Sequence, residues 1–210
     1  MVDFSQVIVS LKTEEADAIN RTAKNFFLGK IPLSFSVRML DKSDLDAISA
    51  LQSESAKKGA LRQNKKKELT KSLEEGVWIG VFNDKSQLEA YTAFELEYLE
   101  GNILLYLKAT AKREGKLKGF QKQTIELRRK LGGNLAEKSM LPFGGGYATC
   151  QPANTRCVDN LMSSGMHRLF HIKGLYGESP QGDRDIFGYG DIFELKELLF
   201  DKWTEEDIWE

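Results

Sequence analysis

Three consecutive segments with the patterns of β-strands occupy the middle of the chain and limit the folds that it can adopt. Residues 77–82 and 102–111 are apolar at nearly every position, whereas residues 88–99 alternate between apolar and polar side chains. The pair Gly101-Asn102 predicts a hairpin turn between the second and third segments. A continuous apolar strand is typical of a sheet centre that is covered on both faces. The sequence therefore predicts a largely antiparallel sheet with residues 102–111 near its centre.

Helical patterns flank these strands on both sides. The order of the elements predicts an α/β (α+β) fold, in which helices flank a mixed, largely antiparallel central sheet. Residues 142–146 include three consecutive glycines and predict a loop. A short apolar stretch lies at 7–11. Two helices are predicted to begin after caps at Thr13 and at Ser43, which pairs with Asp46 in a capping box. Further helices are predicted at 61–73, 120–131, 155–164 and 193–203, and strands at 34–40, 147–150, 167–176 and 184–190.

The length and composition fit one globular domain with short additions at both ends. The chain has 210 residues, of which 41% are hydrophobic, enough for one core of ordinary size. We expect an N-terminal strand/helix extension at 1–33, the main domain at 34–192, and a C-terminal amphipathic helix with an acidic end at 193–210. The longest apolar run is far shorter than the ~20 residues that span a bilayer, and the N-terminus lacks the cationic region of a signal peptide. These features predict a cytoplasmic protein without a membrane partner.

Cysteine and histidine usage indicates neither a disulfide framework nor a metal site. The two cysteines, Cys150 and Cys157, are expected to be thiols in a reducing compartment. The two histidines, His167 and His171, would share a metal only on a helix, and the segment around them alternates like a strand. We therefore expect no metal.

Basic residues are concentrated at one place in a nearly neutral chain. The formal net charge is −1, which disfavours nucleic acid as a partner. Between residues 108 and 130, however, nine basic residues stand against two acidic ones, where a strand is followed by a helix. A helix N-terminus offers free backbone N–H groups, and Gly119 would let a ligand approach them. The segment predicts a site for phosphate groups, with a merely solubilising basic surface as the alternative.

A second motif follows this basic segment. In QPANTRCVDNLMSSGM, residues 151–166, a strand is followed by the spacing P-x-N-x-x-[small], a leucine four residues later, and a glycine with an apolar residue after four more. This arrangement resembles the GNAT family of acyl-CoA-dependent N-acyltransferases, with Cys157 at the small position and Met166 at that of phenylalanine. Residues 116–121, KLKGFQ, approximate the family's [QR]-x-x-G-x-[GA] motif between its fourth strand and third helix. The resemblance covers roughly residues 35–190.

The resemblance implies a GNAT-like fold, in which the family's strands 4 and 5 splay apart, and acetyl-CoA or another acyl-CoA as cosubstrate. Backbone amides from Gly119 to Lys122 would bind the pyrophosphate, and the strand from Lys108 to Ala111 would pair with the pantetheine arm. The acceptor would be an amine of a small molecule or a peptide. The implied cofactor-binding residues are Lys108, Ala109, Ala111, Lys116, Lys118, Gly119, Phe120, Gln121, Lys122 and Asn154.

The catalytic positions depart from the family pattern. Met162 replaces the family's general-acid tyrosine, and residues 103–111 contain neither the carboxylate nor the histidine that serves many members as a base. Gln121 also replaces a small residue of the phosphate loop. The candidates in this chain are Glu95 and Glu97 as bases acting through water, Cys150 as a thiol near the acyl group, and Tyr147, Tyr176 or Tyr189 as an acid.

Two functions from different classes therefore stay open. One is an N-acyltransferase, with acetyl as the favoured acyl group, that works by direct attack of the amine on the thioester. The other is a catalytically impaired GNAT-like module that binds CoA or another anion for regulation. A homodimer is also compatible with the sequence, because seven acidic and two basic residues from Glu194 onward could meet the basic segment of a second copy.

Overall fold

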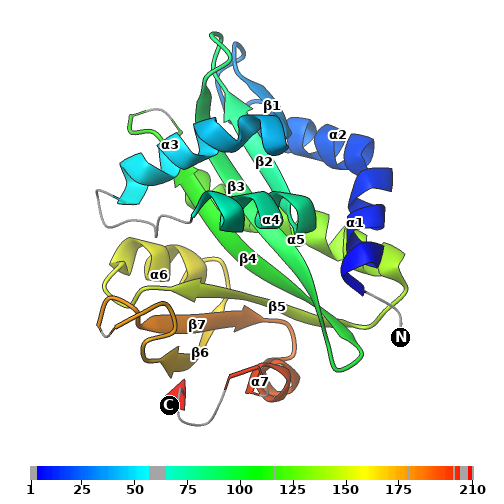
Figure 1. Cartoon of the computed structure of the whole chain (residues 1–210), viewed down its shortest axis with the longest axis vertical. Helices are drawn as coiled ribbons and strands as arrows, with labels where there is room; N and C mark the ends of the chain where they lie inside the picture. Colours follow the sequence, from blue (N-terminus) through cyan, green and yellow to red (C-terminus); the bar gives the residue numbers. More distant parts are fainter. Residues whose placement is uncertain are drawn as a thin grey trace.

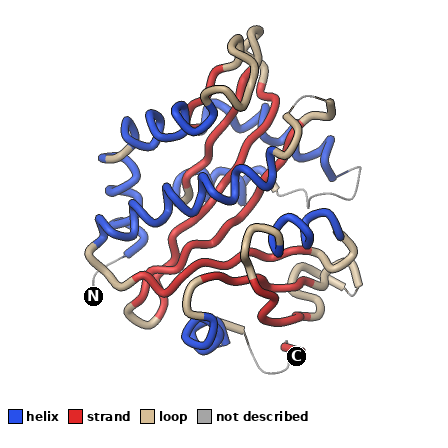
Figure 2. Tube along the Cα trace, turned by 180° about the vertical axis from the view of Figure 1, so that it is seen from behind, coloured by secondary structure: helices blue, strands red, loops and turns tan. Residues whose placement is uncertain are grey.

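One mixed eight-stranded sheet forms the centre of the computed structural model, which describes residues 4–56, 65–115, 117–178, 180–200, 202–203 and 208–209. The strand order is β1-β2-β3-β4-β5-β7-β6-β8 (Figures 1 and 2). All neighbouring strands are antiparallel except β4 and β5, which are parallel. The strands are β1 (Ser36–Met39), β2 (Val77–Phe82), β3 (Leu88–Leu99), β4 (Asn102–Lys112), β5 (Phe143–Cys150), β6 (His167–Ile172), β7 (Arg184–Tyr189) and β8 (Ile208–Trp209). The predicted mixed, largely antiparallel sheet is confirmed.

Helices cover both faces of this sheet. In Figure 1, α3 and α4 lie in front of the sheet and α5 lies behind it; we call these the front and back faces. The helices are α1 (Phe4–Glu14), α2 (Ala16–Phe27), α3 (Leu45–Ala56), α4 (Lys66–Glu75), α5 (Phe120–Ser139), α6 (Thr155–Met162) and α7 (Ile192–Phe200), with a 3-10 turn at Lys42–Asp44. No helix in the described part of the chain is both long enough and apolar enough to cross a bilayer.

Strand β4 contributes to the cores on both faces, as its apolar sequence predicts. Leu105 and Leu107 pack in the back core with α2, α5 and α6. Ala109 and Ala111 pack in the front core with α3 and α4. A third cluster joins Leu104 of β4 to β5, β6, β7 and α7. Both faces of β4 are covered, and this explains why its sequence is an uninterrupted apolar run instead of an alternation of apolar and polar residues.

A β-bulge explains how Leu107 and Ala109 come to lie on opposite faces. Ala93 of β3 pairs with Ala109, and Glu95 pairs with Tyr106. Phe94 therefore faces two residues of β4, Leu107 and Lys108, instead of one. Such a bulge reverses the alternation and takes peptide groups out of the ladder.

The sequence reading was wrong at the N-terminus. The apolar stretch 7–11 was expected as a strand and lies within helix α1, because Ile8 and Leu11 pack on the back core at helical spacing. Thr13 does not cap a helix: it lies inside α1, where its hydroxyl donates to Val9 O at 2.8 Å.

Two helix starts were also placed incorrectly. The capping box before α3 is formed by Asp41 and Asp44 instead of Ser43 and Asp46, since the Asp44 carboxylate also binds Arg38. The predicted helix 61–73 corresponds to α4, which runs from Lys66 to Glu75, and residues 57–64 lie outside the described part of the chain.

The three consecutive glycines do not form the predicted loop. They lie in β5, where Gly146 pairs with Tyr189 of β7. A Cβ at Gly146 would lie 2.4 Å from the Tyr189 ring, and one at Gly144 would lie 2.9 Å from Leu104. The glycines are therefore explained by the close approach of neighbouring side chains. The predicted hairpin turn is displaced by one residue, to Glu100 and Gly101, which both have positive φ.

Helix α5 contains adjacent glycines in different surroundings, which gives a test of its packing on β4. A Cβ at Gly132 would lie 2.4 to 3.0 Å from three side-chain atoms of Leu105, whereas nothing lies within 4 Å of one at Gly133. Gly132→Ala should lower the free energy of unfolding by about 1–2 kcal/mol, because the cost of overpacking exceeds the gain in helix propensity. Gly133→Ala should raise it by about 0.5–1 kcal/mol. Urea denaturation of both variants measures this, and equal shifts would contradict the packing described.

Candidate active site

The parallel pair β4–β5 separates halfway along its length. The strands pair at Ile103 with Phe143, at Leu105 with Gly146 and at Tyr106 with Tyr147. Beyond Tyr106, β4 continues to Lys112 and stays paired with β3, and within the described residues no pairing to β5 follows. The splay predicted for the fourth and fifth strands is thus present, and it begins at the bulge. An open strand edge of this kind can pair with an extended ligand.

The N-terminus of α5 lies just beyond the open edge. Gly119, the residue before the helix, has a left-handed φ of 70° that glycine adopts without strain. The first N–H groups of a helix lack acceptors within it and favour an anion. Lys118 and Lys122 are exposed at this end of α5. Lys116, predicted to contribute charge, lies outside the described residues.

The other residues predicted to form the phosphate site have structural partners. Phe120 is buried and its ring stacks on Phe27 with centroids 5.6 Å apart, so only its backbone faces the loop. The side chain of Gln121 accepts a hydrogen bond from Asn160 of α6 at 2.9 Å. This contact holds the Gln121 side chain toward α6. Asn154 caps the same helix, since its side-chain oxygen accepts from Cys157 N at 3.1 Å.

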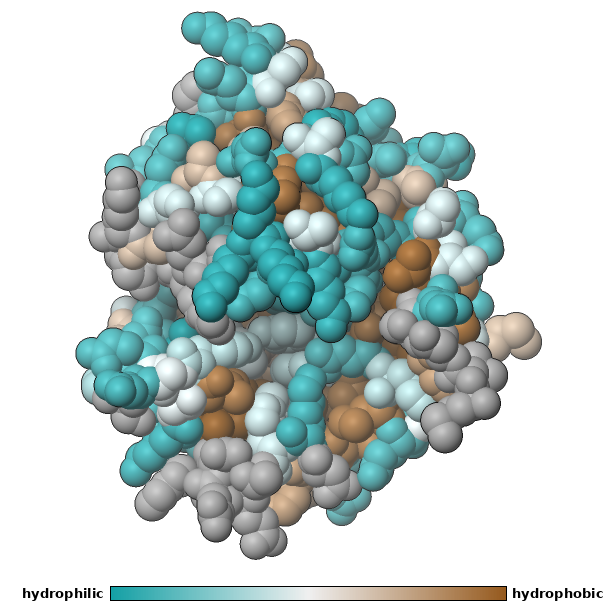
Figure 3. All heavy atoms as spheres, in the orientation of Figure 1, coloured by the Kyte–Doolittle hydropathy of each residue, from teal (hydrophilic) through white to brown (hydrophobic). Residues whose placement is uncertain are grey.

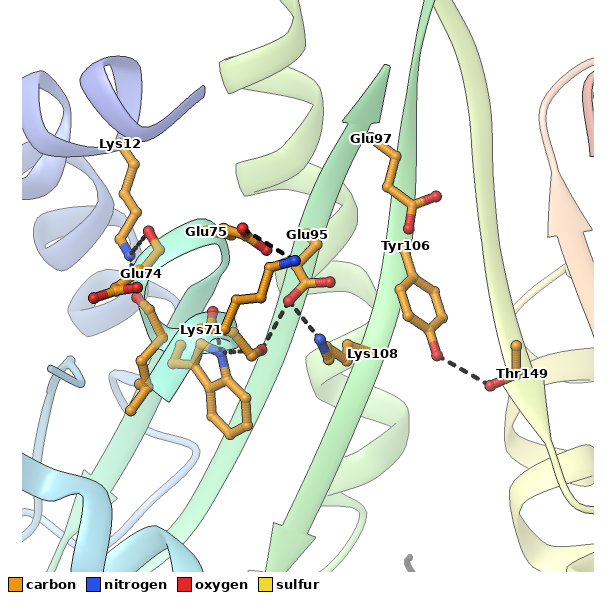
Figure 4. Close-up of polar contacts among 12 residues, drawn as sticks. Lys12, Lys71, Glu74, Glu75, Glu95, Glu97, Tyr106, Lys108 and Thr149 are labelled. Carbon is orange, nitrogen blue, oxygen red and sulfur yellow. Dashed lines mark hydrogen bonds and ion pairs between the residues drawn. The ribbon is translucent and has the colours of Figure 1, made fainter. Parts of the chain in front are cut away.

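The side chains of three residues predicted to bind the cofactor point to the front face: those of the two alanines, Ala109 and Ala111, and that of Lys108. Ala109 and Ala111 pack in the front core. The ammonium of Lys108 lies 2.5 Å from Oε1 of Glu95, which also accepts from Ser72 Oγ at 2.7 Å (Figure 4). The Lys108 side chain is 24% exposed and that of Glu95 is 14% exposed, so the two form a partly buried ion pair.

Lys12 of α1 lies beside this cluster and was not singled out from the sequence. Its ammonium donates to Leu73 O at 2.5 Å and to Glu74 O at 3.0 Å (Figure 4). Burial lowers the pKa of Lys12, although Glu74 and Glu95 oppose that shift. The N-terminal helix therefore supports α4 next to the Glu95 cluster.

Glu97 is held by residues from two distant segments. Its Oε2 accepts from the Tyr147 hydroxyl at 2.6 Å and from Lys202 Nζ at 2.5 Å. Burial raises the pKa of Tyr147 well above its usual value, and the charge of Glu97 adds to the shift. The Tyr147 hydroxyl therefore keeps its proton and donates it in the hydrogen bond to Glu97.

Tyr106 bridges the splay on the front face. It lies opposite Glu95 in the ladder, and its hydroxyl is 3.1 Å from Thr149 Oγ1 of β5 and 3.1 Å from the hydroxyl of Tyr176. Burial, with Tyr176 adding to it, raises the pKa of Tyr106 well above its usual value, so the phenol keeps its proton. Figure 3 shows that the surface recedes below α4, in front of these strands. The sequence carried one signal for Tyr106: it is the single phenol in the apolar run 102–111.

Tyr189 and Cys150 lie toward the back face. The guanidinium of Arg129 lies 4.0 Å from the centre of the Tyr189 ring, and burial raises the pKa of Tyr189 to about 12 against the charges of Arg129 and Arg128. Cys150 is 3% exposed at the end of β5. Of the three tyrosines predicted as the acid, Tyr176 and Tyr147 contact Tyr106, the first through its hydroxyl at 3.1 Å and the second by ring stacking with centroids 4.7 Å apart, whereas Tyr189 lies on the other side of the sheet.

The histidines do not form a metal pair, because His167 and His171 lie on strand β6. His171 Nδ1 lies 2.9 Å from Asp185 Oδ1. Within the described ranges, no group of three or more histidine, cysteine or acidic side chains could hold a metal ion.

Comparisons with known proteins give a likeness of structure without a likeness of sequence. No protein-family model matches the sequence. No curated protein shows significant sequence similarity to it either.

Several solved structures superimpose on most of the chain. An N-acetyltransferase from Staphylococcus aureus has a TM-score of 0.56 at 14% identity, over 74% of this chain and 96% of its own. The spermidine/spermine N-acetyltransferase SpeG from Vibrio cholerae, determined with manganese ions, has a TM-score of 0.52 at 15% identity, over 74% and 92%. The protein yncA from Salmonella typhimurium, determined with its cofactor acetyl-CoA, has a TM-score of 0.54 at 11% identity, over 74% and 93%. The chain therefore has the fold of the GNAT N-acetyltransferases.

Proposed function

We propose that the chain is an acyl-CoA-dependent N-acyltransferase that moves an acetyl group to an amine of a small molecule or peptide. The observation that carries this proposal is the coincidence of two binding features at one end of β4. The strand edge is open from the bulge to Lys112, and helix α5, with the free amides of its N-terminus, begins eight residues later at Phe120. An extended chain that ends in phosphates fits both features at once.

Acyl-CoA would bind through backbone groups more than through side chains. The amides of Gln121 and Lys122 would hold the pyrophosphate, with charge from Lys116, Lys118 and Lys122. The pantetheine amides would pair with the edge of β4 from Lys108 to Ala111. Asn154 would line the other side of the arm from the start of α6, and Gln121 is turned toward α6 by its bond to Asn160.

The front-face residues would carry the chemistry. The amine nitrogen would attack the thioester carbon, and a backbone N–H of the bulge at Leu107 or Lys108 would hold the oxyanion. As the carbon–sulfur bond breaks, Tyr106 would give its proton to the leaving thiolate, and Tyr176 would restore that proton from the surface. Glu95, opposite Tyr106, would take the amine proton through water.

The acceptor class rests on two arguments. Direct attack requires a nucleophilic nitrogen beside the thioester that loses a proton as it attacks, and an amine is such a nucleophile. The Vibrio cholerae protein of the same fold is a spermidine/spermine N-acetyltransferase. An amine acceptor is therefore the favoured substrate class.

The second candidate function is a CoA-binding module without turnover. Met162, in place of the family's tyrosine, is 57% exposed and has no acidic proton to give. The two glutamates predicted as bases, Glu95 and Glu97, are already paired with lysines. Binding without release of free CoA in the presence of varied amines would favour the module.

The first test is binding of acetyl-CoA to the full chain. At a hundred times its dissociation constant it should stabilise the fold by about 2.7 kcal/mol, seen as a rise in melting temperature. Gly119→Glu should abolish that rise, because it places a carboxylate at the anion site. The matched control is Gly29→Glu. Gly29 follows α2 and has a similar φ of 75°, and a Cβ added there would have no atom within 4 Å. An unchanged melting temperature with acetyl-CoA and with longer acyl-CoA would contradict both candidate functions.

The second test concerns the proton donor. Tyr106→Phe should lower kcat about 100-fold in release of free CoA, with the dissociation constant of acetyl-CoA unchanged, because only the proton is lost. Tyr98→Phe is the control, since the Tyr98 ring stacks on Phe4 away from Thr149; its turnover should be unaltered. Equal activity of the Tyr106→Phe variant and the wild type would exclude Tyr106 as the acid.

A further inference from the structure

The fold brings both cysteines of the chain to one backbone carbonyl. The Cys150 sulfur lies 3.9 Å from Asn154 O, and the same oxygen accepts from Cys157 N at 2.9 Å. Both residues pack against the back core. The two thiols are also hydrogen-bonding partners. The end of β5 and the first turn of α6 thus form a compact dithiol, although both cysteines are free thiols here.

The two thiols have different surroundings. Cys150 is buried, and its single proton has the Cys157 sulfur, Gln151 O and Asn154 O as acceptors. Cys157 is partly exposed, in the first turn of α6, where helix N–H groups favour an anion. The hydrogen bond from Cys150 lowers the pKa of Cys157 against the effect of burial, and a hydrogen bond from Gln121 and the charge of Arg128 lower it further. The same bond to Cys157, with burial, raises the pKa of Cys150. Cys157 is therefore the nucleophile of the pair.

We propose that Cys150 and Cys157 are an oxidation site that forms an intramolecular disulfide in the presence of a peroxide. The Cys157 thiolate attacks one peroxide oxygen, the oxygen–oxygen bond breaks, and hydroxide leaves as water after taking a proton. The Cys157 sulfenic acid is then attacked by the Cys150 sulfur. The sulfur–sulfur bond forms, the sulfur–oxygen bond breaks, and the Cys150 proton leaves with that oxygen as a second water. Two thiols are oxidised and one hydrogen peroxide is reduced.

The position of the disulfide gives it a structural consequence. It would tie the first turn of α6 to the end of β5, on the β5 side of the splay. The disulfide would restrain α6. Through α6 it would also restrain Asn154, which caps this helix, and Gln121, which binds Asn160 of the helix. An effect on acetyl-CoA affinity rests on the proposed function, whereas the formation of the disulfide does not.

The experiment treats the reduced, folded full chain with one equivalent of hydrogen peroxide. Titratable thiols should fall from two to none, with a mass lower by two hydrogen atoms and no covalent dimer. Peptide mapping without reductant should show Cys150 linked to Cys157, and a thiol reductant should restore both. Loss of the thiols without this linkage, or persistence of both thiols, would overturn the proposal.

Single variants test the assigned roles. In Cys150→Ser, a dimedone-type probe should trap a sulfenic acid on Cys157, because the second thiol is missing. In Cys157→Ser, Cys150 should be labelled at least tenfold more slowly. Thermal melting of both variants checks that they are folded, and the wild-type linkage stands as evidence even where one variant fails to fold. Faster labelling of Cys150 than of Cys157 would overturn the assignment of the nucleophile.

Discussion

The point at which β4 and β5 stop pairing determines where the candidate site lies. Strand β4 stays hydrogen-bonded to β3 beyond Tyr106, but the bulge at Leu107 and Lys108 changes its course, and β5 no longer follows. Backbone groups on the open edge need partners, because unpaired buried N–H and C=O groups are costly. A ligand with its own amides can supply them. The same strand leads to the N-terminus of α5, so the position of the proposed anion site follows from the course of β4.

The basic segment contributes less free charge to this site than its composition indicates. Lys108 is paired with Glu95, and Arg113 lies 3.1 Å from Glu54. Arg128 is buried, with Nε donating to Thr124 O, and burial lowers its pKa to about 10. Among the described basic residues around the helix start, Lys118 and Lys122 have exposed side chains. Affinity for phosphate should therefore come mostly from backbone amides and these two ammonium groups.

Strands β1 to β4, β6 and β7 could be predicted from local periodicity, because each shows the pattern that its burial requires. Strand β5 was predicted only at 147–150, and β8 was not predicted. The resemblance to the GNAT family also predicted the splay, which the structure confirms, whereas the phosphate loop stays a prediction. Local patterns failed where a distant contact decides the structure. Stretch 7–11 becomes helical by packing on the back core, and Gly146 lies in a strand because the Tyr189 ring occupies the space of a side chain.

The candidate site was harder to predict than the fold for the same reason. Lys202 reaches Glu97 across 105 residues of sequence, and Tyr106 meets Tyr176 across 70. No spacing rule connects such positions. The cysteine pair is an intermediate case, since seven residues separate Cys150 from Cys157, but only the turn from β5 into α6 brings them to Asn154 O.

The most direct measurement of the central claim is amide hydrogen exchange of the full chain with and without saturating acetyl-CoA. If the open edge of β4 and the start of α5 bind the cosubstrate, exchange should slow at the amides of residues 107–111 and of Gln121 and Lys122, while the hairpin at Glu100 and Gly101 exchanges as before. Protection elsewhere, with these amides unchanged, would contradict the account.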